Sequence, residues 1–113
     1  MRLINQTKNI VLADDVFIAK TFFSRAKGLL GRKTFLSNQV LILDPGNSVH
    51  TFFMQFAIDL IFVDQDYRII QIVHNLRPNR LTPIYWRSNK VIEFPAGKLS
   101  AVNAQLKDQL QIL

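Results

Sequence analysis

Two carboxylates and a histidine stand out in this chain because they lie inside or beside apolar runs, where a polar group needs a partner. Asp59 interrupts the apolar run 56–63, Glu93 interrupts the run 91–94, and His50 comes just before an aromatic stretch. Two carboxylates that share a cleft can divide the roles of acid and base, as in glycoside cleavage, and a nearby histidine can relay protons. One interpretation is therefore a hydrolase or lyase that uses Asp59 and Glu93 with His50.

The same residues also have structural interpretations. A carboxylate in a strand is stabilised by a cation, and Arg32 and Arg25 are the basic residues that we expect to pair with Asp59. Such a pair either holds a helix end against a sheet or anchors a ligand, and both alternatives stay open. A lone histidine such as His50 is more often a hydrogen-bonded structural group than a ligand of a metal.

Several classes of chemistry are excluded by the composition and the spacing. The chain has no cysteine, which rules out disulfides, zinc–thiolate sites, iron–sulfur clusters and cysteine nucleophiles. It also has no Gly-x-Ser-x-Gly and no His-x-x-x-His. We therefore expect neither a metal nor a cofactor.

The charge is strongly basic. The 14 Lys and Arg against 8 Asp and Glu give a net charge of +6, and the basic residues gather in 20–33 and again in 77–90. Such clusters favour weak association with polyanions, so weak nucleic-acid binding is a third interpretation. No helix-turn-helix or aromatic ribonucleoprotein motif accompanies them, which favours solvated basic faces instead.

The segment Leu76–Lys90 is rich in proline and is expected to be an irregular loop that is either mobile or ligand-facing. It carries Tyr85 and Trp86 among basic residues. These rings could stack on a sugar ring, a base or a partner's proline, or one of them could close the end of a β-sandwich.

The elements that must position these residues are mostly strands. The spacing predicts a helix capped by Ser24 and ended by Gly31, a long strand over 52–63, and a hairpin turn at 64–67. A second short helix is expected between Ser100 and Leu106. Further strands are predicted over 3–4, 10–13, 16–19, 40–43, 68–73, 91–94 and 110–113. Residues 1–113 are expected to form a single, mainly β domain, a sandwich or barrel with one or two short helices.

Three motifs follow one another along the chain: Arg25-x-x-Gly28-Leu29-Leu30-Gly31-Arg32-x-x-x-Leu36, then His50-Thr51-Phe52-Phe53-Met54-Gln55-Phe56-Ala57-Ile58-Asp59-Leu60-Ile61-Phe62-Val63-Asp64, then Val91-Ile92-Glu93-Phe94-Pro95-Ala96-Gly97. Together they cover most of residues 16–113 and resemble the domain of unknown function number 192 family, also called uncharacterised protein family 0127. The resemblance implies a compact β-rich domain with small helices. It implies no assigned activity.

The chain departs from the family's pattern at positions where the backbone takes special geometry. The family's glycine before the motif methionine is Phe53, its proline before Ile-Asp is Ala57, its hairpin glycine is Tyr67, and its late Gly-Asp turn is Lys107-Asp108. A positive φ at Tyr67 would cost on the order of 1 kcal/mol. The polar motif residues are all in place.

We expect a binding or interaction module rather than an enzyme, because nucleophile motifs and metal spacing are missing and only 19% of the residues are charged. Its ligand is expected to be small and anionic or carbohydrate-like, since arginine and the basic charge favour acceptors, and a protein partner is the alternative. The candidate ligand-binding residues are His50, Met54, Asp59, Arg32, Glu93 and Trp86.

The N-terminal residues lack the apolar core of a signal peptide. No apolar stretch approaches the roughly 20 residues that cross a bilayer. We therefore expect a soluble, cytoplasmic protein without a membrane-inserted segment.

Overall fold

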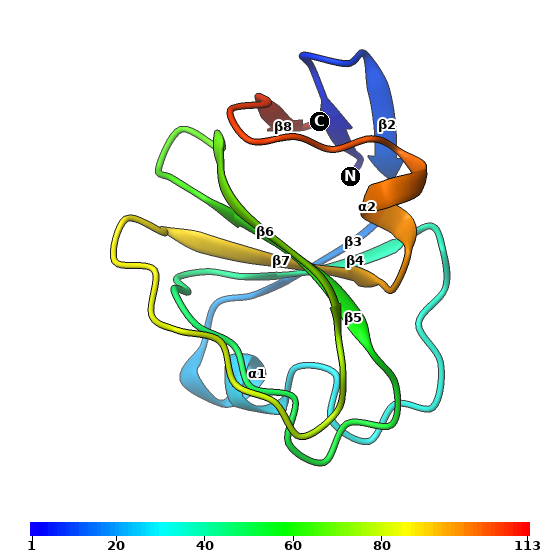
Figure 1. Ribbon diagram of the computed structural model, residues 1–113, viewed down its shortest axis with the longest axis vertical. Helices are drawn as coiled ribbons and strands as arrows, with labels where there is room; N and C mark the ends of the chain where they lie inside the picture. The colour runs from blue at the N-terminus through cyan, green and yellow to red at the C-terminus, as the bar shows by residue number, and fades with distance from the viewer.

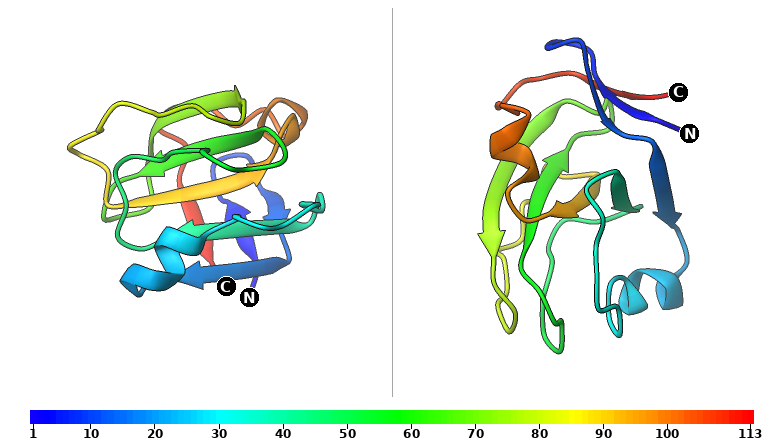
Figure 2. Two further views of the ribbon diagram at one scale, coloured as in Figure 1. Left: turned by 90° about the horizontal axis from the view of Figure 1, so that it is seen from below. Right: turned by 90° about the vertical axis from the view of Figure 1, so that its right-hand side faces the viewer.

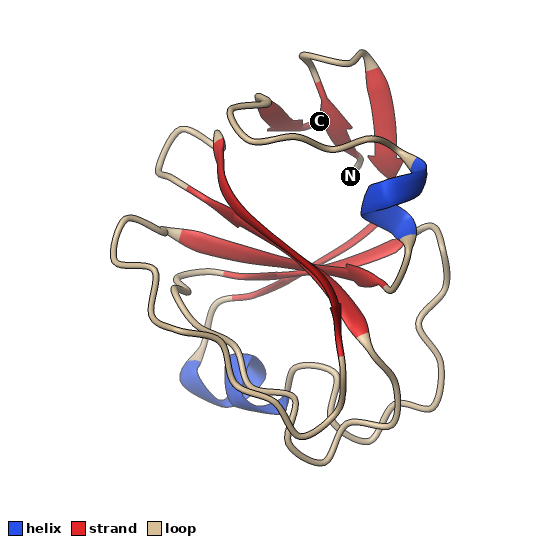
Figure 3. Cartoon of the chain, in the orientation of Figure 1, coloured by secondary structure: helices blue, strands red, loops and turns tan.

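A computed structural model describes the backbone of residues 1–113 and every side chain except those of Phe22 and Phe23. The fold is mainly β, as the sequence predicts, with two sheets and two short helices (Figures 1 and 3). The elements in chain order are β1 (Leu3–Asn5), β2 (Ile10–Ala13), β3 (Asp15–Ala19), α1 (Phe22–Lys27), β4 (Gln39–Leu43), β5 (Ile58–Val63), β6 (Ile69–Leu76), β7 (Lys90–Pro95), α2 (Lys98–Ala101) and β8 (Leu110–Ile112).

The larger sheet has the strand order β3-β4-β7-β5-β6. Its β3 and β4 run parallel, whereas β4–β7, β7–β5 and β5–β6 are antiparallel pairs. All six residues of β5 are buried, which explains why its sequence is a nearly continuous apolar run rather than a clean alternation. Both faces of this sheet are therefore covered.

One face of the larger sheet packs against the smaller sheet and α2. The smaller sheet has the order β2-β1-β8 and brings both ends of the chain together, at the top of Figure 1. Side chains at alternate positions of β5 and β7, such as Ile61 and Ile92, join Leu3, Leu99 and Leu110 in one buried cluster. This cluster holds the two sheets together through burial of apolar surface.

The other face is covered by α1 and by the loops at the opposite end of the molecule (Figure 2). Leu60 and Phe62 of β5 and Val91 of β7 point to this side, where they pack with Leu29 and Met54. The alternation of side chains along each strand thus assigns every core residue of β5 and β7 to one of two clusters.

The first helix differs from the sequence prediction in its ends. Thr21, not Ser24, is the N-cap: its hydroxyl accepts a hydrogen bond from the Ser24 N–H at 3.1 Å, and the Ser24 hydroxyl accepts one from the Thr21 N–H at 3.1 Å. This reciprocal pair is a capping box. The helix ends at Gly28, three residues before the predicted Gly31, because Gly28 takes a φ of +44°. The second helix also starts earlier than predicted, at Lys98.

The predicted strand over 52–63 begins only at Ile58. The residues before it form a turn in which the Met54 N–H donates to the Thr51 carbonyl at 3.2 Å and Phe53 takes a φ of +64°. Aromatic residues suit strands by propensity, but this local turn overrides the apolar pattern. The hairpin turn after β5 is where the sequence predicts it, between β5 and β6.

Three positions at which the family pattern has glycine take positive φ in this chain. Phe53, Tyr67 and Lys107 have φ values of +64°, +62° and +74°. Side chains disfavour this left-handed region by roughly 1–2 kcal/mol per residue. The three residues therefore adopt a conformation that glycine adopts without strain.

The segment 77–89 is irregular, as predicted, yet it is firmly anchored. It runs beside residues 46–51, with hydrogen bonds from Thr82 N–H to the Val49 carbonyl at 2.9 Å and from Tyr85 N–H to the Asn47 carbonyl at 2.8 Å.

Among the described residues, neither helix has the length and apolar character that a membrane-spanning helix needs.

Candidate functional site

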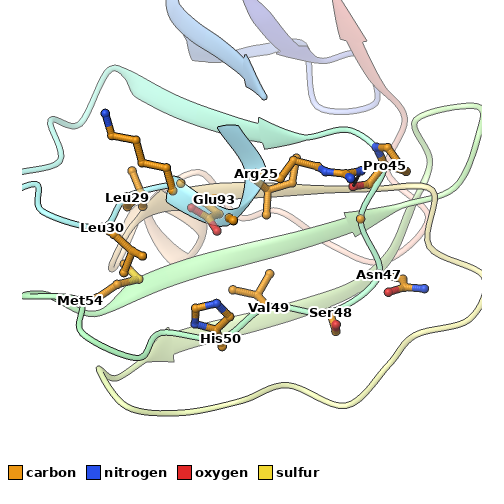
Figure 4. A pocket seen from close by; sticks show the side chains of 15 residues that line it. Arg25, Leu29, Leu30, Pro45, Asn47, Ser48, Val49, His50, Met54 and Glu93 are labelled. Carbon is orange, nitrogen blue, oxygen red and sulfur yellow. Dashed lines mark hydrogen bonds between the residues drawn. The ribbon is translucent and has the colours of Figure 1, made fainter. Parts of the chain in front are cut away.

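A cavity of about 260 Å³ lies between the end of α1, the loop after β4 and one face of the larger sheet. Figure 4 shows Glu93 near its centre, with Leu30 and Met54 on one side and Arg25 and Pro45 on the other. Three segments that are distant in the sequence therefore meet here. They are residues 25–30, residues 43–54 and the single side chain of Glu93 from β7.

Glu93 forms the floor of the cavity. It is 4% exposed, and its neighbours across the sheet are Leu41 on β4 and Leu60 on β5, so apolar side chains surround the carboxyl group. This burial raises the pKa of Glu93 to about 8, because the charged form loses its hydration. Glu93 is therefore mostly protonated and neutral at pH 7.

The Glu93 carboxyl group is also free to bind. Among the side chains that the structure describes, its Oε2 is a buried oxygen without a hydrogen-bond partner. Buried polar atoms are nearly always paired, so an unpaired one that lines a cavity marks a place where a ligand can bind. The sequence singled out Glu93, but not its position at the bottom of a cavity.

His50 lies at the mouth of the same cavity. It is exposed, its ring stacks on Phe52 with the centroids 5.4 Å apart, and its backbone pairs with Leu81. Met54, four residues later, is 8% exposed and forms part of the apolar wall. The structure therefore brings together three of the predicted residues, His50, Met54 and Glu93.

The cavity has a cationic edge supplied by α1. Arg25 and Lys27 line it, and the Arg25 guanidinium donates a hydrogen bond to the Pro45 carbonyl at 3.2 Å. That bond holds the planar guanidinium beside the opening. The sequence predicts Arg25 only as a partner for Asp59. The presence of Arg25 in the first family motif and of Glu93 in the third is the sequence feature that could have indicated a shared site.

Asp59 lies elsewhere and has partners that were not predicted. It is fully buried, and its carboxylate accepts hydrogen bonds from the Leu99 N–H at 3.1 Å and from the Asn75 N–H at 2.8 Å. The expected pairing of Asp59 with Arg32 is wrong, since the Arg32 guanidinium lies over the Phe17 ring, 5.3 Å from its centroid. Backbone N–H groups replace the expected cation, because they satisfy a buried carboxylate equally well.

The predicted pair of catalytic carboxylates is also wrong. In the register of β5 and β7, Asp59 is opposite Phe94 and Leu60 is opposite Glu93. Successive side chains of a strand point to opposite faces of the sheet, so Asp59 and Glu93 lie on opposite faces. They cannot act on one substrate in a shared cleft.

Trp86 lies outside the cavity. It is 81% exposed, whereas its neighbour Tyr85 packs on Phe62 with the ring centroids 4.6 Å apart. Of the two predicted roles of this aromatic pair, stacking on a ligand or closing the end of the β-sandwich, Tyr85 has the second.

The described residues contain no cluster of three or more His, Asp or Glu that could hold a metal ion.

A second hollow, of about 490 Å³, is larger and more open to solvent. Its walls are mostly apolar, with Phe35 and Phe56 at 6.1 Å between ring centroids, and Lys33 is its one charged residue among those described. It contains no buried ionisable group. Of the two cavities, the smaller one therefore contains a buried ionisable group, Glu93.

Comparison with known proteins gives one family. Residues 3–112 match the family DUF192, described as an uncharacterised ACR. The chain is 30% identical over 112 residues to a UPF0127 protein of Pyrococcus horikoshii, with 96% of each protein covered. Solved structures of a protein of unknown function from Novosphingobium aromaticivorans and of a candidate transcription regulator from Sinorhizobium meliloti have the same fold. Their TM-scores are 0.86 and 0.82, their identities 21% and 22%, and the match covers 99% and 97% of this chain and 84% and 89% of theirs.

Proposed function

The chain belongs to the DUF192 family, and we propose that it is a binding module for a small hydroxylated organic acid, of the size and chemistry of a uronic acid. The observation that carries the proposal is the neutral carboxyl group of Glu93, whose Oε2 has no partner among the described side chains, at the floor of a mostly apolar cavity with a cationic edge. Each part of the cavity matches one part of such a ligand.

The size of the cavity favours a small ligand. Sites for drug-sized molecules usually measure about 300–1,000 Å³. The cavity of about 260 Å³ lies just below that range and suits a single sugar ring or a similar molecule. Leu29, Val49 and Met54 offer the apolar wall that the C–H groups of such a ring would contact.

The protonation of Glu93 favours hydroxyl and carboxylate groups in the ligand. A neutral carboxyl group can donate its O–H to a ligand oxygen and accept a hydrogen bond from a ligand hydroxyl. It does not repel an anion, whereas an ionised carboxylate would. The pKa of about 8 keeps this property through neutral pH.

The cationic edge supports an acidic group on the ligand. Arg25 and Lys27 line the cavity, and a guanidinium binds a carboxylate with two parallel hydrogen bonds. Because Arg25 is held at the Pro45 carbonyl, little conformational entropy is lost when it binds an anion. A binding role is favoured over hydrolysis because this cavity holds one carboxyl group, not a pair.

Isothermal titration calorimetry at pH 6.5 tests this function with D-glucuronate, D-glucose and propionate as ligands. We expect D-glucuronate to bind best, because it alone has both the hydroxyl and the acidic groups. Glu93→Leu should weaken its binding by about tenfold or more, as expected for loss of a hydrogen bond to a charged group. Leucine suits the apolar floor, so the variant is expected to fold.

Arg25→Gln should weaken the binding of D-glucuronate but not that of D-glucose. Lys98→Gln is the matched control, since it removes a positive charge from α2, which packs against the other face of the sheet. Equal affinity for the three compounds, no binding at millimolar concentrations, or unchanged binding of D-glucuronate by Glu93→Leu would contradict the proposal.

A further inference from the structure

The β4–β5 and β6–β7 loops run side by side at the end of the molecule opposite the smaller sheet (Figures 1 and 2). They carry a group of exposed apolar and basic side chains. We call this group the tip and define it as Phe52, Phe53, Arg77, Arg80 and Leu81. Phe53 is 85% exposed, Leu81 66% and Phe52 42%. Large apolar side chains that gather in an exposed patch usually mark an interaction surface.

We propose that the tip docks the protein onto an anionic membrane surface. The occupant is a lipid bilayer with acidic headgroups, into whose interface Phe53 and Leu81 insert while Arg77 and Arg80 contact the headgroups. No membrane-spanning segment is involved. The proposal is independent of the ligand of the cavity.

Several backbone N–H groups of the tip have hydrogen-bond partners within its two loops. The Phe53 N–H donates to Asn79 Oδ1 at 3.3 Å, the Met54 N–H to the Thr51 carbonyl at 3.2 Å, and the Thr51 N–H to the Arg80 carbonyl at 2.9 Å. The Arg80 N–H donates in turn to the Thr51 hydroxyl at 2.9 Å. Because unpaired N–H groups are costly in a bilayer, loops with internal bonds of this kind can approach it without that cost.

The side chain of Phe53 contributes little to the packing of the core. A phenylalanine with a φ of +64° and 85% exposure has backbone strain and buries little of its ring. Glycine, the residue of the family pattern, would relieve that strain. A strained residue that presents an aromatic ring to solvent is better explained by a surface that receives the ring.

The positive charge of the tip and of the whole chain favours binding to an anionic surface. The tip holds two arginines, and the chain has a net charge of +6. Basic residues near an anionic leaflet each contribute roughly 1 kcal/mol of attraction. Single-stranded nucleic acid would also attract arginine, but it gains stacking only from aromatic rings, whereas Leu81 contributes only to an apolar environment.

Co-sedimentation with vesicles tests the proposal. Vesicles of phosphatidylcholine alone are compared with vesicles of phosphatidylcholine and phosphatidylglycerol in a ratio of about 3:1, whose acidic headgroups attract basic residues. We expect binding to the anionic vesicles and much weaker binding to the neutral ones. Phe53→Gly should reduce vesicle binding by about tenfold, the loss expected when a large apolar side chain no longer inserts. Its thermal unfolding temperature should be unchanged or higher, because the backbone strain is removed.

Two variants serve as controls for position and charge. Leu106→Ser removes an exposed apolar side chain at the other end of the molecule and should not change vesicle binding. The double substitution Arg77→Gln and Arg80→Gln should abolish the preference for anionic vesicles, whereas Arg2→Gln with Lys107→Gln removes the same charge far from the tip and should not. Equal binding to both vesicle types, unchanged binding by Phe53→Gly, or displacement from vesicles by single-stranded DNA would overturn the proposal.

Discussion

Glu93 shows how one buried side chain can be unfavourable for stability and favourable for binding. Its carboxyl group lies among apolar side chains, and Oε2 has no partner among the side chains that the structure describes. Its pKa is raised from the usual 4.5 to about 8. Protein cores do not keep such groups for packing, because an apolar residue of similar size would pack better.

The raised pKa predicts how stability changes with pH. The folded protein holds the proton of Glu93 more tightly than the unfolded chain does, so binding of this proton stabilises the folded state. This contribution to the free energy of unfolding is complete below pH 4.5 and is lost as the pH rises through 8. Glutamine does not titrate and keeps the shape. Glu93→Gln should therefore exceed the wild type in unfolding free energy at pH 7, by on the order of 3 kcal/mol.

Urea unfolding at several pH values measures this difference. The two proteins should converge as the pH falls below 4.5 and should diverge as it rises through neutrality. Asp66→Asn, at an exposed position of the β5–β6 turn, is the control and should show no such divergence. A gap between Glu93→Gln and wild type that does not depend on pH would show that Glu93 is not buried in its neutral form.

At the scale of the elements, Asp59 connects three parts of the chain that are far apart in sequence. It lies in β5, and its carboxylate binds the N–H of Leu99 in the first turn of α2 and the N–H of Asn75 near the end of β6. It therefore acts as a non-local cap, because the free N–H groups of a helix start need acceptors. Its location on the face away from the cavity favours the structural clamp over the ligand site.

Asp59→Asn should destabilise the fold by about 1–3 kcal/mol. The asparagine NH₂ group replaces one carboxylate oxygen and cannot accept a hydrogen bond, so one of the two backbone N–H groups loses its acceptor. The affinity for D-glucuronate should stay the same, since Asp59 does not line the cavity. Thermal unfolding together with calorimetry measures both properties on one sample. A stable Asp59→Asn protein that has lost ligand binding would show instead that Asp59 belongs to the binding site.

At the scale of the whole molecule, local patterns predict the elements but not how they meet. The β5–β6 hairpin and the irregular segment 77–89 follow from turn chemistry and proline content. The late start of β5 at Ile58 does not, because the turn that holds Phe53 depends on hydrogen bonds to residues of another loop, such as Asn79.

The candidate site shows the same limit. The apolar surroundings of Glu93, Asp59 and Met54 mark them in the sequence as unusual or buried. Alternation within a strand cannot say which face of the sheet a residue takes relative to another strand, because that depends on register. The opposite placement of Asp59 and Glu93 therefore becomes visible only when β5 and β7 are paired.

We expect the neutral carboxyl group of Glu93, at the floor of the cavity, to receive an acidic ligand. Glu93 is the only glutamate in the chain, so labelling with ¹³C-glutamate gives a single side-chain carboxyl signal in NMR spectra. We predict that this signal titrates with a pKa of about 8 and that saturation with D-glucuronate raises this pKa, because a bound anion favours the neutral form. A titration near 4.5, or one that D-glucuronate does not move, would show that Glu93 is not a neutral group that receives an acidic ligand.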